Sequence, residues 1–169
     1  PLEHHAAEGT GWILALDPAA GRLIRSAPLR AGQYVFPVSI AEAPDGTIYA
    51  GIHPDASLFS LNPATGEIRD WGRMDDAEHY AYVMCGADGT VAALVKMARP
   101  HVVALDLATG ARRPVGPAAD TDAGAGRVEL FKAADGLLYI DSHEGVFRLR
   151  GTEAAPVAVA APLPVPATS

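Results

Sequence analysis

Short stretches in which apolar and polar residues alternate run through most of the sequence. In the segment 57–61, Leu58 and Ser60 lie on one face of an extended strand, while Phe59 and Leu61 lie on the other. No segment keeps apolar residues three and four positions apart for long enough to make a helix, and glycine or proline interrupts almost every window. The pattern therefore predicts an all-β chain built from short strands.

Two kinds of turn recur between these stretches with a period of about 45 residues. The first opens with Asp or Asn and closes with glycine, at 17–21, 62–66 and 106–110. The second is an Asp-Gly pair, at 45–46, 88–89 and 135–136. An Asp or Asn side chain can bond the backbone of its own turn, and glycine adopts the positive φ that closes it. Two interleaved turns per period predict four strands per repeat, which is the pattern of a β-propeller blade.

The turns place the strands of each repeat. An incomplete first repeat has two strands, expected at 12–16 and 22–26. The next two repeats have four strands each, expected at 34–41, 47–51, 57–61 and 67–71, and then at 80–85, 91–95, 101–105 and 112–115. The fourth repeat is expected at 127–132, 137–141, 145–149 and 156–160, with a connection at 150–153 that departs from the turn pattern. The predicted blades span approximately 1–30, 31–75, 76–118 and 119–160, and a proline-rich tail follows at 161–169.

Three and a half blades do not close a ring, because propellers generally have four to eight. A chain with this content would leave strand edges and a blade face open at both ends. We therefore expect a single partial propeller domain, completed either by further blades of a longer protein or by a second copy of the chain.

Charge and cysteine content narrow the function classes. The net charge of −7 and the pI near 5.2 argue against a nucleic-acid partner. No run of eighteen apolar residues is present, so we expect no membrane span. Cys85 is the only cysteine and lies in an apolar stretch, which excludes an internal disulfide and predicts a buried free thiol.

The predicted blades also have a polarity, because both recurrent turns lie at one edge and the loops between second and third strands lie at the other. All six histidines fall at this second edge: His53, His101 and His143 in such loops, His4 and His5 before the first of them, and His79 in a link between blades. Imidazoles gathered at one edge suit metal binding or acid–base chemistry. The alternative is that polar residues simply collect in loops.

Aromatic and cationic side chains are expected at the same edge. From the combined set we assign candidate catalytic roles to His53, His79, Tyr80, His101 and His143, and candidate substrate-binding roles to Arg73, Arg99 and Tyr82. Histidine and tyrosine can supply an acid and a base, and arginine pairs with a carboxylate through two parallel hydrogen bonds. The competing interpretation is that Tyr34, Phe36 and Tyr82 belong to the core between blades and that the acidic run 75–78 is a solvated loop.

No cofactor is predicted. The glycine-containing link 122–126 lacks the lysine and the helix of a phosphate-binding loop, and no Gly-x-Ser-x-Gly or Cys-x-x-Cys motif occurs. A divalent metal held by several histidines is the alternative, although no His-x-His or His-x-x-x-His pair supports it.

The stretch 32–73 has a recognisable pattern. It contains His-Pro-Asp-Ala-Ser-Leu-Phe-Ser-Leu-Asn-Pro-Ala-Thr-Gly at 53–66 and Asp-Trp-Gly-Arg at 70–73. This resembles the blade of bacterial seven-bladed propellers related to rhamnose–glucuronate lyases and rhamnohydrolases, with His53 in the place usually held by tyrosine and Trp71 in the place of leucine. The resemblance covers the second blade well, the third partly and the fourth only generically. The same turn chemistry is shared with quinoprotein-like and streptogramin-lyase-like propellers.

The resemblance implies a secreted or periplasmic protein that acts on a polysaccharide or oligosaccharide at a uronate linkage, by elimination or by hydrolysis. The second functional hypothesis is a non-catalytic propeller that binds a protein or glycan partner.

Overall fold

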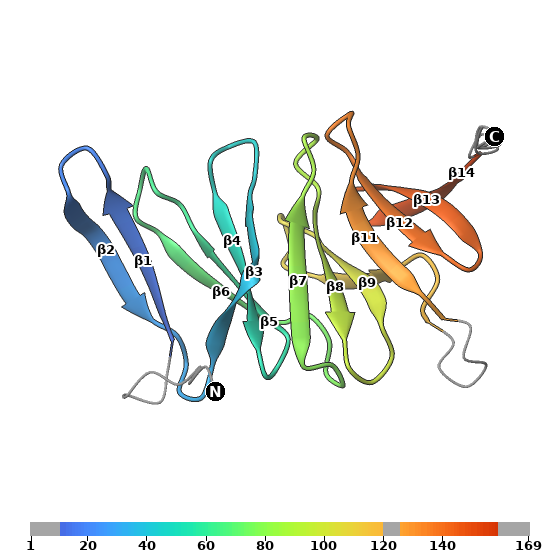
Figure 1. Cartoon of the computed structure of the whole chain (residues 1–169), viewed down its shortest axis with the longest axis horizontal. Helices are drawn as coiled ribbons and strands as arrows, with labels where there is room; N and C mark the ends of the chain where they lie inside the picture. Colours follow the sequence, from blue (N-terminus) through green and yellow to red (C-terminus); the bar gives the residue numbers. More distant parts are fainter. Residues whose placement is uncertain (1–10, 120–125, 159–169) are drawn as a thin grey trace, which may run out of the picture.

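The computed structural model describes residues 11–119 and 126–158, and these residues form an all-β structure. They make four antiparallel sheets that stand side by side in an open row along the longest dimension of the molecule (Figure 1). No helix capable of spanning a membrane is found in the described part of the chain. The all-β fold expected from the alternating pattern is confirmed.

Each sheet is built from strands that follow one another in the sequence. The first sheet pairs β1 (Trp12–Asp17) with β2 (Arg22–Pro28). The second contains β3 (Tyr34–Glu42), β4 (Ile48–His53), β5 (Ser57–Leu61) and β6 (Ile68–Arg73). The third contains β7 (Tyr80–Cys85), β8 (Val91–Lys96), β9 (His101–Leu105) and β10 (Arg112–Val115). The fourth contains β11 (Val128–Lys132), β12 (Leu138–Ser142), β13 (Gly145–Arg150) and β14 (Glu153–Val157). This division into two strands and then three groups of four matches the predicted repeats.

The last strand was predicted in the wrong place. We expected a strand at 156–160, whereas β14 begins at Glu153, which pairs directly with Arg150 of β13. The connection is therefore a two-residue turn in which Gly151 takes the positive φ of 56° that such a tight reversal requires. Of the remaining predicted strands, those at 57–61, 80–85, 101–105 and 112–115 match the observed bounds, and the others differ by one or two residues at their ends.

The first recurrent turn is held by the side chain that opens it. The Oδ1 atom of Asn62 accepts hydrogen bonds from the backbone N–H groups of Ala64 and Thr65, at 2.9 and 3.2 Å. Oδ1 atoms of Asp17 and Asp106 make the equivalent pairs of bonds in their own turns. This local bonding explains why Asp or Asn recurs at the position.

The Asp-Gly turns are equally regular. Asp45, Asp88 and Asp135 each accept a hydrogen bond from the backbone N–H two residues further on, at 2.9, 3.1 and 2.9 Å. The following glycine has a φ between 79° and 85° in all three turns. The structure thus confirms both turns on which the repeat was assigned.

A backbone hydrogen bond also repeats next to the last two strands of each of the first three sheets. A buried residue after the last strand donates its N–H to the carbonyl of the residue that precedes the strand before it. These pairs are Leu29 and Gly11 (3.0 Å), Met74 and Ala56 (2.8 Å), and Ala119 and Pro100 (2.8 Å). The donors are 45 residues apart, so the repeat extends to the loops as well as the turns.

Hydrophobic cores lie on both faces of the second and third sheets. Leu58 of β5 belongs to the cluster shared with β7, β8 and β9, whereas Phe59 belongs to a cluster that includes Leu29 at the end of the first sheet. A further cluster joins the other face of the third sheet to the fourth, with Val102 and Leu138 fully buried in it. Alternate residues of one strand therefore enter different cores, as expected for a sheet packed between two neighbours.

The first strands of the second and third sheets are joined through one side chain. Ser39 of β3 is fully buried, and its hydroxyl donates to the Ala81 carbonyl at 2.5 Å and accepts the N–H of Val83 at 2.9 Å. The pairing of β3 with β4 is irregular between Val35 and Ile40, and Ser39 lies in this irregular stretch. Gly51 of β4 lies at the same place, where a Cβ atom would overlap the Ala81 carbonyl and the Ser39 hydroxyl.

Candidate functional site

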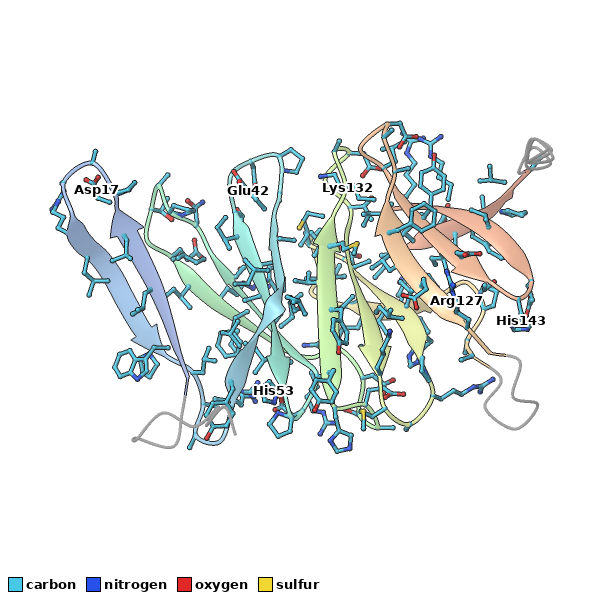
Figure 2. The ribbon with its side chains drawn as sticks, viewed as in Figure 1. Asp17, Glu42, His53, Arg127, Lys132 and His143 are labelled. Atoms are coloured by element: carbon cyan, nitrogen blue, oxygen red, sulfur yellow. The ribbon has the colours of Figure 1, made fainter. Side chains whose placement is uncertain are left out.

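The described histidines lie away from the recurrent turns. His53 ends β4, His101 begins β9, His143 lies between β12 and β13, and His79 lies in the link before β7. Figure 2 shows Asp17, Glu42 and Lys132 along one edge of the molecule and His53 at the opposite edge, with His143 far from His53 in the last sheet. His4 and His5 lie outside the described residues.

Four aromatic side chains form a row across the second and third sheets. We call Tyr34, His53, Tyr80 and Tyr82 the ring row. The centroid of the His53 ring lies 5.6 Å from that of Tyr34, its pairing partner across β3 and β4, and 5.6 Å from that of Tyr80. His53 and Tyr80 are stacked with an interplanar angle of 24°, and Tyr82 follows Tyr80 at 6.3 Å. The row thus joins two sheets at the edge where the histidines lie.

The ring row is half-buried, so it is both packed and accessible. Tyr82 contacts the core between the third and fourth sheets, and burial, followed by the nearby Tyr80, raises its pKa. The interpretation of Tyr82 as part of the core is therefore confirmed in part, because the side chain packs against this core and is half-buried. The ammonium of Lys96 lies 5.4 Å from the Tyr82 ring centroid, a cation–π contact, and 4.0 Å from a carboxylate oxygen of Glu129.

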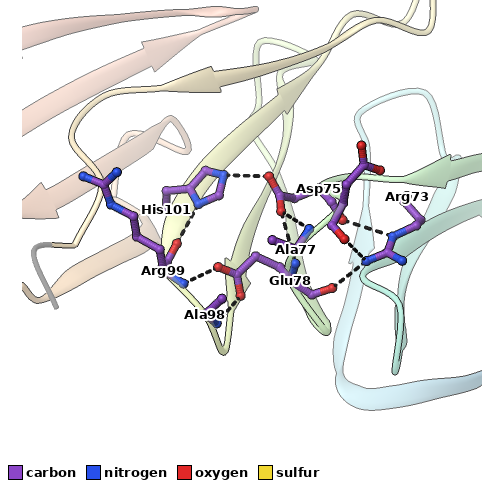
Figure 3. A network of polar contacts seen from close by, with 8 residues as sticks. Arg73, Asp75, Ala77, Glu78, Ala98, Arg99 and His101 are labelled. Carbon is purple, nitrogen blue, oxygen red and sulfur yellow. Dashed lines mark hydrogen bonds and ion pairs between the residues drawn. The ribbon is translucent and has the colours of Figure 1, made fainter.

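A polar network occupies the link between the second and third sheets (Figure 3). The guanidinium of Arg73 donates to three backbone carbonyls of this link: Asp75 (3.2 Å), Asp76 (2.7 Å) and Glu78 (3.1 Å). The donors of the Arg73 guanidinium are therefore used to hold the backbone of the link, which weakens the assignment of Arg73 as a substrate-binding residue. We call the side chains of Arg73, Asp75, Glu78, Arg99 and His101, with the backbone groups that they bond, the link network.

His101 is held on both sides within the link network. Its Nδ1 atom lies 2.7 Å from the Arg99 carbonyl and must therefore donate to it. Its Nε2 atom lies 3.4 Å from Oδ2 of Asp75, and the side chain is only 15% exposed. The other oxygen of Asp75 accepts the N–H groups of Ala77 and Glu78. This imidazole connects the link to the start of β9.

The acidic run 75–78 is a solvated loop only in part, because Asp76 and Ala77 are exposed whereas Glu78 is buried. Glu78 is 1% exposed, and its carboxylate accepts the backbone N–H of Ala98 at 2.8 Å and that of Arg99 at 2.5 Å. These donors lie in the loop between β8 and β9. The prediction was wrong at Glu78 because a run of charged residues is usually solvated, whereas here the last carboxylate turns inward to meet backbone donors.

His79 and Arg99 are exposed. The backbone of His79 joins three segments, because its carbonyl accepts the N–H of Ala56 at 3.0 Å and its N–H donates to the Lys96 carbonyl at 3.2 Å. The Nε atom of Arg99 donates to the Ala119 carbonyl at 3.2 Å. The Arg99 guanidinium is therefore fixed at one corner while its side chain remains at the surface.

His143 belongs to a different site. Its Nε2 atom lies 3.6 Å from Glu144, and it lines a shallow hollow of about 290 Å³ with Arg127, Asp141 and Ser142. Arg127 and Asp141 pair at 3.4 Å across this hollow. The structure therefore does not bring His143 together with His53, Tyr80 or His101.

The described histidines do not assemble a metal centre. Among residues 11–119 and 126–158, no group of three or more His, Cys, Asp or Glu side chains is placed to hold a metal ion. Cys85 is a buried free thiol, as expected, and burial raises its pKa to about 12.

Two residues near the site received no functional role in the sequence analysis. Gln33 immediately precedes the ring row and is 4% exposed; its Nε2 atom donates to Asp55 at 2.6 Å. Glu78 lies 45 residues further on, one repeat later, and also binds the loop between the second and third strands of its own sheet. Extending the period from the turns to the links would have indicated both residues.

Comparison with known proteins yields no family model and no curated protein that matches this chain.

Proposed function

We propose that the four sheets are consecutive blades of a β-propeller, with β3, β7 and β11 as the strands nearest the axis. The order of strands within each sheet, the two recurrent turns and the 45-residue spacing of Leu29, Met74 and Ala119 support this arrangement. The described sheets form an open row, so the complete ring would require further blades or a second copy.

We propose that this propeller binds a glycan at the ring row. The observation that carries the proposal is the stack of His53 on Tyr80, extended by Tyr34 and Tyr82 across two sheets. The apolar C–H face of a sugar ring packs on an aromatic ring, while the hydroxyl and imidazole groups at the ring edges bond the sugar hydroxyls. A row of half-buried rings suits an extended chain of sugars better than one compact ligand.

The charges beside the ring row favour an acidic sugar. The Lys96 ammonium lies against the Tyr82 ring, and the Arg99 side chain is exposed at the neighbouring loop. Arginine and lysine both bind carboxylates, arginine through its planar pair of donors. The resemblance of the stretch 32–73 to propellers related to rhamnose–glucuronate lyases supports a uronate-containing glycan.

A second candidate function is turnover of that glycan by elimination or hydrolysis. It is favoured by the contact of His53 with Tyr80, because histidine and tyrosine together can remove and deliver a proton at one sugar unit. Catalytic roles at His101 and His143 receive less support, since His101 is held in the link network and His143 lies in the last sheet.

The test is a calorimetric titration of the protein with rhamnose–glucuronate oligosaccharides. We expect saturable binding that weakens about tenfold in His53→Ala, and unchanged binding in the matched control His143→Ala. Samples from the same mixture distinguish the two functions. Ultraviolet absorbance from an unsaturated uronate indicates elimination, free rhamnose indicates hydrolysis, and binding without either product indicates a binding module. No binding, or equal binding by both variants, would contradict a glycan site at the ring row.

A further inference from the structure

Glu78 is a buried carboxylate that the ring row does not use. It is 1% exposed, and its two oxygens accept different backbone N–H groups, from Ala98 and Arg99. Both donors belong to residues whose own side chains are exposed in the loop between β8 and β9. A carboxylate withdrawn from water and bonded to two backbone donors fixes the path of that loop.

The loop has a conformation that it would not adopt by itself. Met97, the first residue after β8, has a φ of 135°, a value that residues with side chains rarely take. Its side chain is 64% exposed, so packing of that side chain does not account for the conformation. Backbone strain of this kind persists only where the surroundings impose it, and the adjacent bonds from Ala98 and Arg99 to Glu78 are such a constraint.

The backbone of the link that carries Glu78 is held by side-chain hydrogen bonds. Arg73 bonds three carbonyls of the link, including that of Glu78, and Asp75 accepts the N–H of Glu78 at 3.1 Å. Asp75 also faces His101 at the far end of the same loop. The loop is therefore attached to the link near its middle and at its end.

In the preceding sheet, the equivalent loop is bound by an amide side chain in place of a carboxylate. Gln33 occupies the position one repeat before Glu78, and its amide donates to Asp55 of the loop between β4 and β5. That loop contains Pro54, which has no N–H to offer a carboxylate, and the Oε1 atom of Gln33 is buried without a partner among the described residues. A carboxylate is thus used where the loop supplies two backbone donors, and an amide where the loop supplies a carboxylate.

The loop 97–100, which Glu78 binds, begins beside the ring row. Lys96 immediately precedes it and pairs with Tyr80 across β7 and β8, and the Lys96 ammonium lies over the Tyr82 ring. Two residues beyond Met97, Arg99 projects from the same loop. Lys96 is held by the pairing of β8 with β7, whereas the position of Arg99 relative to the rings depends on the loop that Glu78 holds.

We propose that Glu78 is a positioning residue: it fixes the loop 97–100 so that Arg99 is presented to the ligand at the ring row. The role in ligand presentation rests on the proposed glycan-binding function, whereas the anchoring of the loop is independent of it.

Amide hydrogen exchange measured by NMR on the unaltered protein tests the anchoring. We expect the amides of Ala98 and Arg99 to exchange slowly although both residues are exposed, because their hydrogens are bonded to a buried carboxylate. Exchange of both amides at the rate of an unstructured peptide would overturn the proposal without any variant being made.

The variant Glu78→Gln tests the effect on the ligand. One of the two N–H groups would then face an amide NH₂ in place of an oxygen, and we expect exchange at 98 and 99 to accelerate about tenfold or more. Affinity for the rhamnose–glucuronate oligosaccharide should fall about tenfold while the circular dichroism spectrum is unchanged. The control is Glu67→Gln, at an exposed turn on the opposite edge, which should change neither quantity.

The outcomes separate this inference from the proposed function. Faster exchange with undiminished oligosaccharide affinity would overturn the positioning role and leave the glycan site intact. An unaltered protein that binds no oligosaccharide would contradict the proposed function and remove ligand presentation with it, while the exchange rates still decide whether Glu78 anchors the loop. If Glu78→Gln does not fold, the exchange rates of the unaltered protein decide the anchoring.

Discussion

The hydroxyl of Ser39 accepts a hydrogen bond from the backbone N–H of Val83 at 2.9 Å, although the two residues are 44 positions apart. The same hydroxyl donates to the Ala81 carbonyl, so one buried side chain satisfies two main-chain groups of β7. The neighbouring sheets are therefore joined by a specific polar contact as well as by the apolar core between them.

Replacement of Ser39 by alanine should leave the Ala81 carbonyl and the Val83 N–H buried without this partner. We expect Ser39→Ala to lower the free energy of unfolding by about 1–3 kcal/mol, measured by urea denaturation. Thr65→Ala, which alters an exposed turn, is the control and should change it by less than about 0.5 kcal/mol. Equal stability of the two variants would show that the Ser39 contact does not contribute to holding the sheets together.

Gly51 and Gly21 should respond to alanine for different reasons. A Cβ atom on Gly51 would overlap the Ala81 carbonyl and the Ser39 hydroxyl, so Gly51→Ala must separate β4 from β7. Gly21 has a φ of 59° and open space around it, so Gly21→Ala should cost about 1–2 kcal/mol from backbone strain alone. We expect the Gly51 variant to be the less stable of the two in thermal denaturation. The reverse order would contradict the close approach of the two strands.

Asp106 should contribute to the acid sensitivity of the fold. Hydrogen bonds from the side chain and backbone of Thr109 and from the backbone of Ala108 lower its pKa below the ordinary value of 3.8. Because the folded-state pKa is the lower one, the contribution of Asp106 to stability is full above 3.8 and is lost as the pH falls through the folded-state value.

The variant Asp106→Asn isolates this effect. Asn62 makes the same two bonds in the equivalent turn, so an amide should preserve the geometry and remove the titration. We expect the melting temperature of the variant to fall less steeply with pH below 3.8 than that of the unaltered protein. Identical slopes would show that this carboxylate does not contribute to the pH dependence.

Cys85 should be chemically inert in the folded protein. Burial raises the pKa of its thiol to about 12, and the nearby Lys132 lowers it only in part. Because the thiolate is the nucleophile, iodoacetamide at pH near 8 should leave native Cys85 unmodified and alkylate it fully after unfolding in urea. Mass spectrometry of the intact protein reads both results. Rapid alkylation of the native protein would contradict the burial of this side chain.

Much of the fold could be predicted from the sequence because its turns are local. Asp17, Asn62 and Asp106 bond their own turns, so a few adjacent residues contain the whole signal. The start of β14 could not be predicted in this way. Gly151 and Thr152 reverse the chain without an Asp or Asn, and the alanine-rich strand that follows has little alternation.

The candidate site was only partly predictable. The edge that contains His53, Tyr80 and His101 follows from the order of strands, which the turns specify. The separation of His101 into the link network and the burial of Glu78 depend on contacts between segments about 20 residues or more apart. Such contacts leave no local pattern, although the spacing from Gln33 to Glu78 matches the repeat.

The most direct test of a glycan site at the ring row is an NMR titration that follows the ring protons of the histidines. With a rhamnose–glucuronate oligosaccharide, we predict saturable chemical-shift changes at His53, which stacks on Tyr80, and none at His143 in the last sheet. Shifts at both histidines alike, or at neither, would contradict the assignment of glycan binding to the ring row.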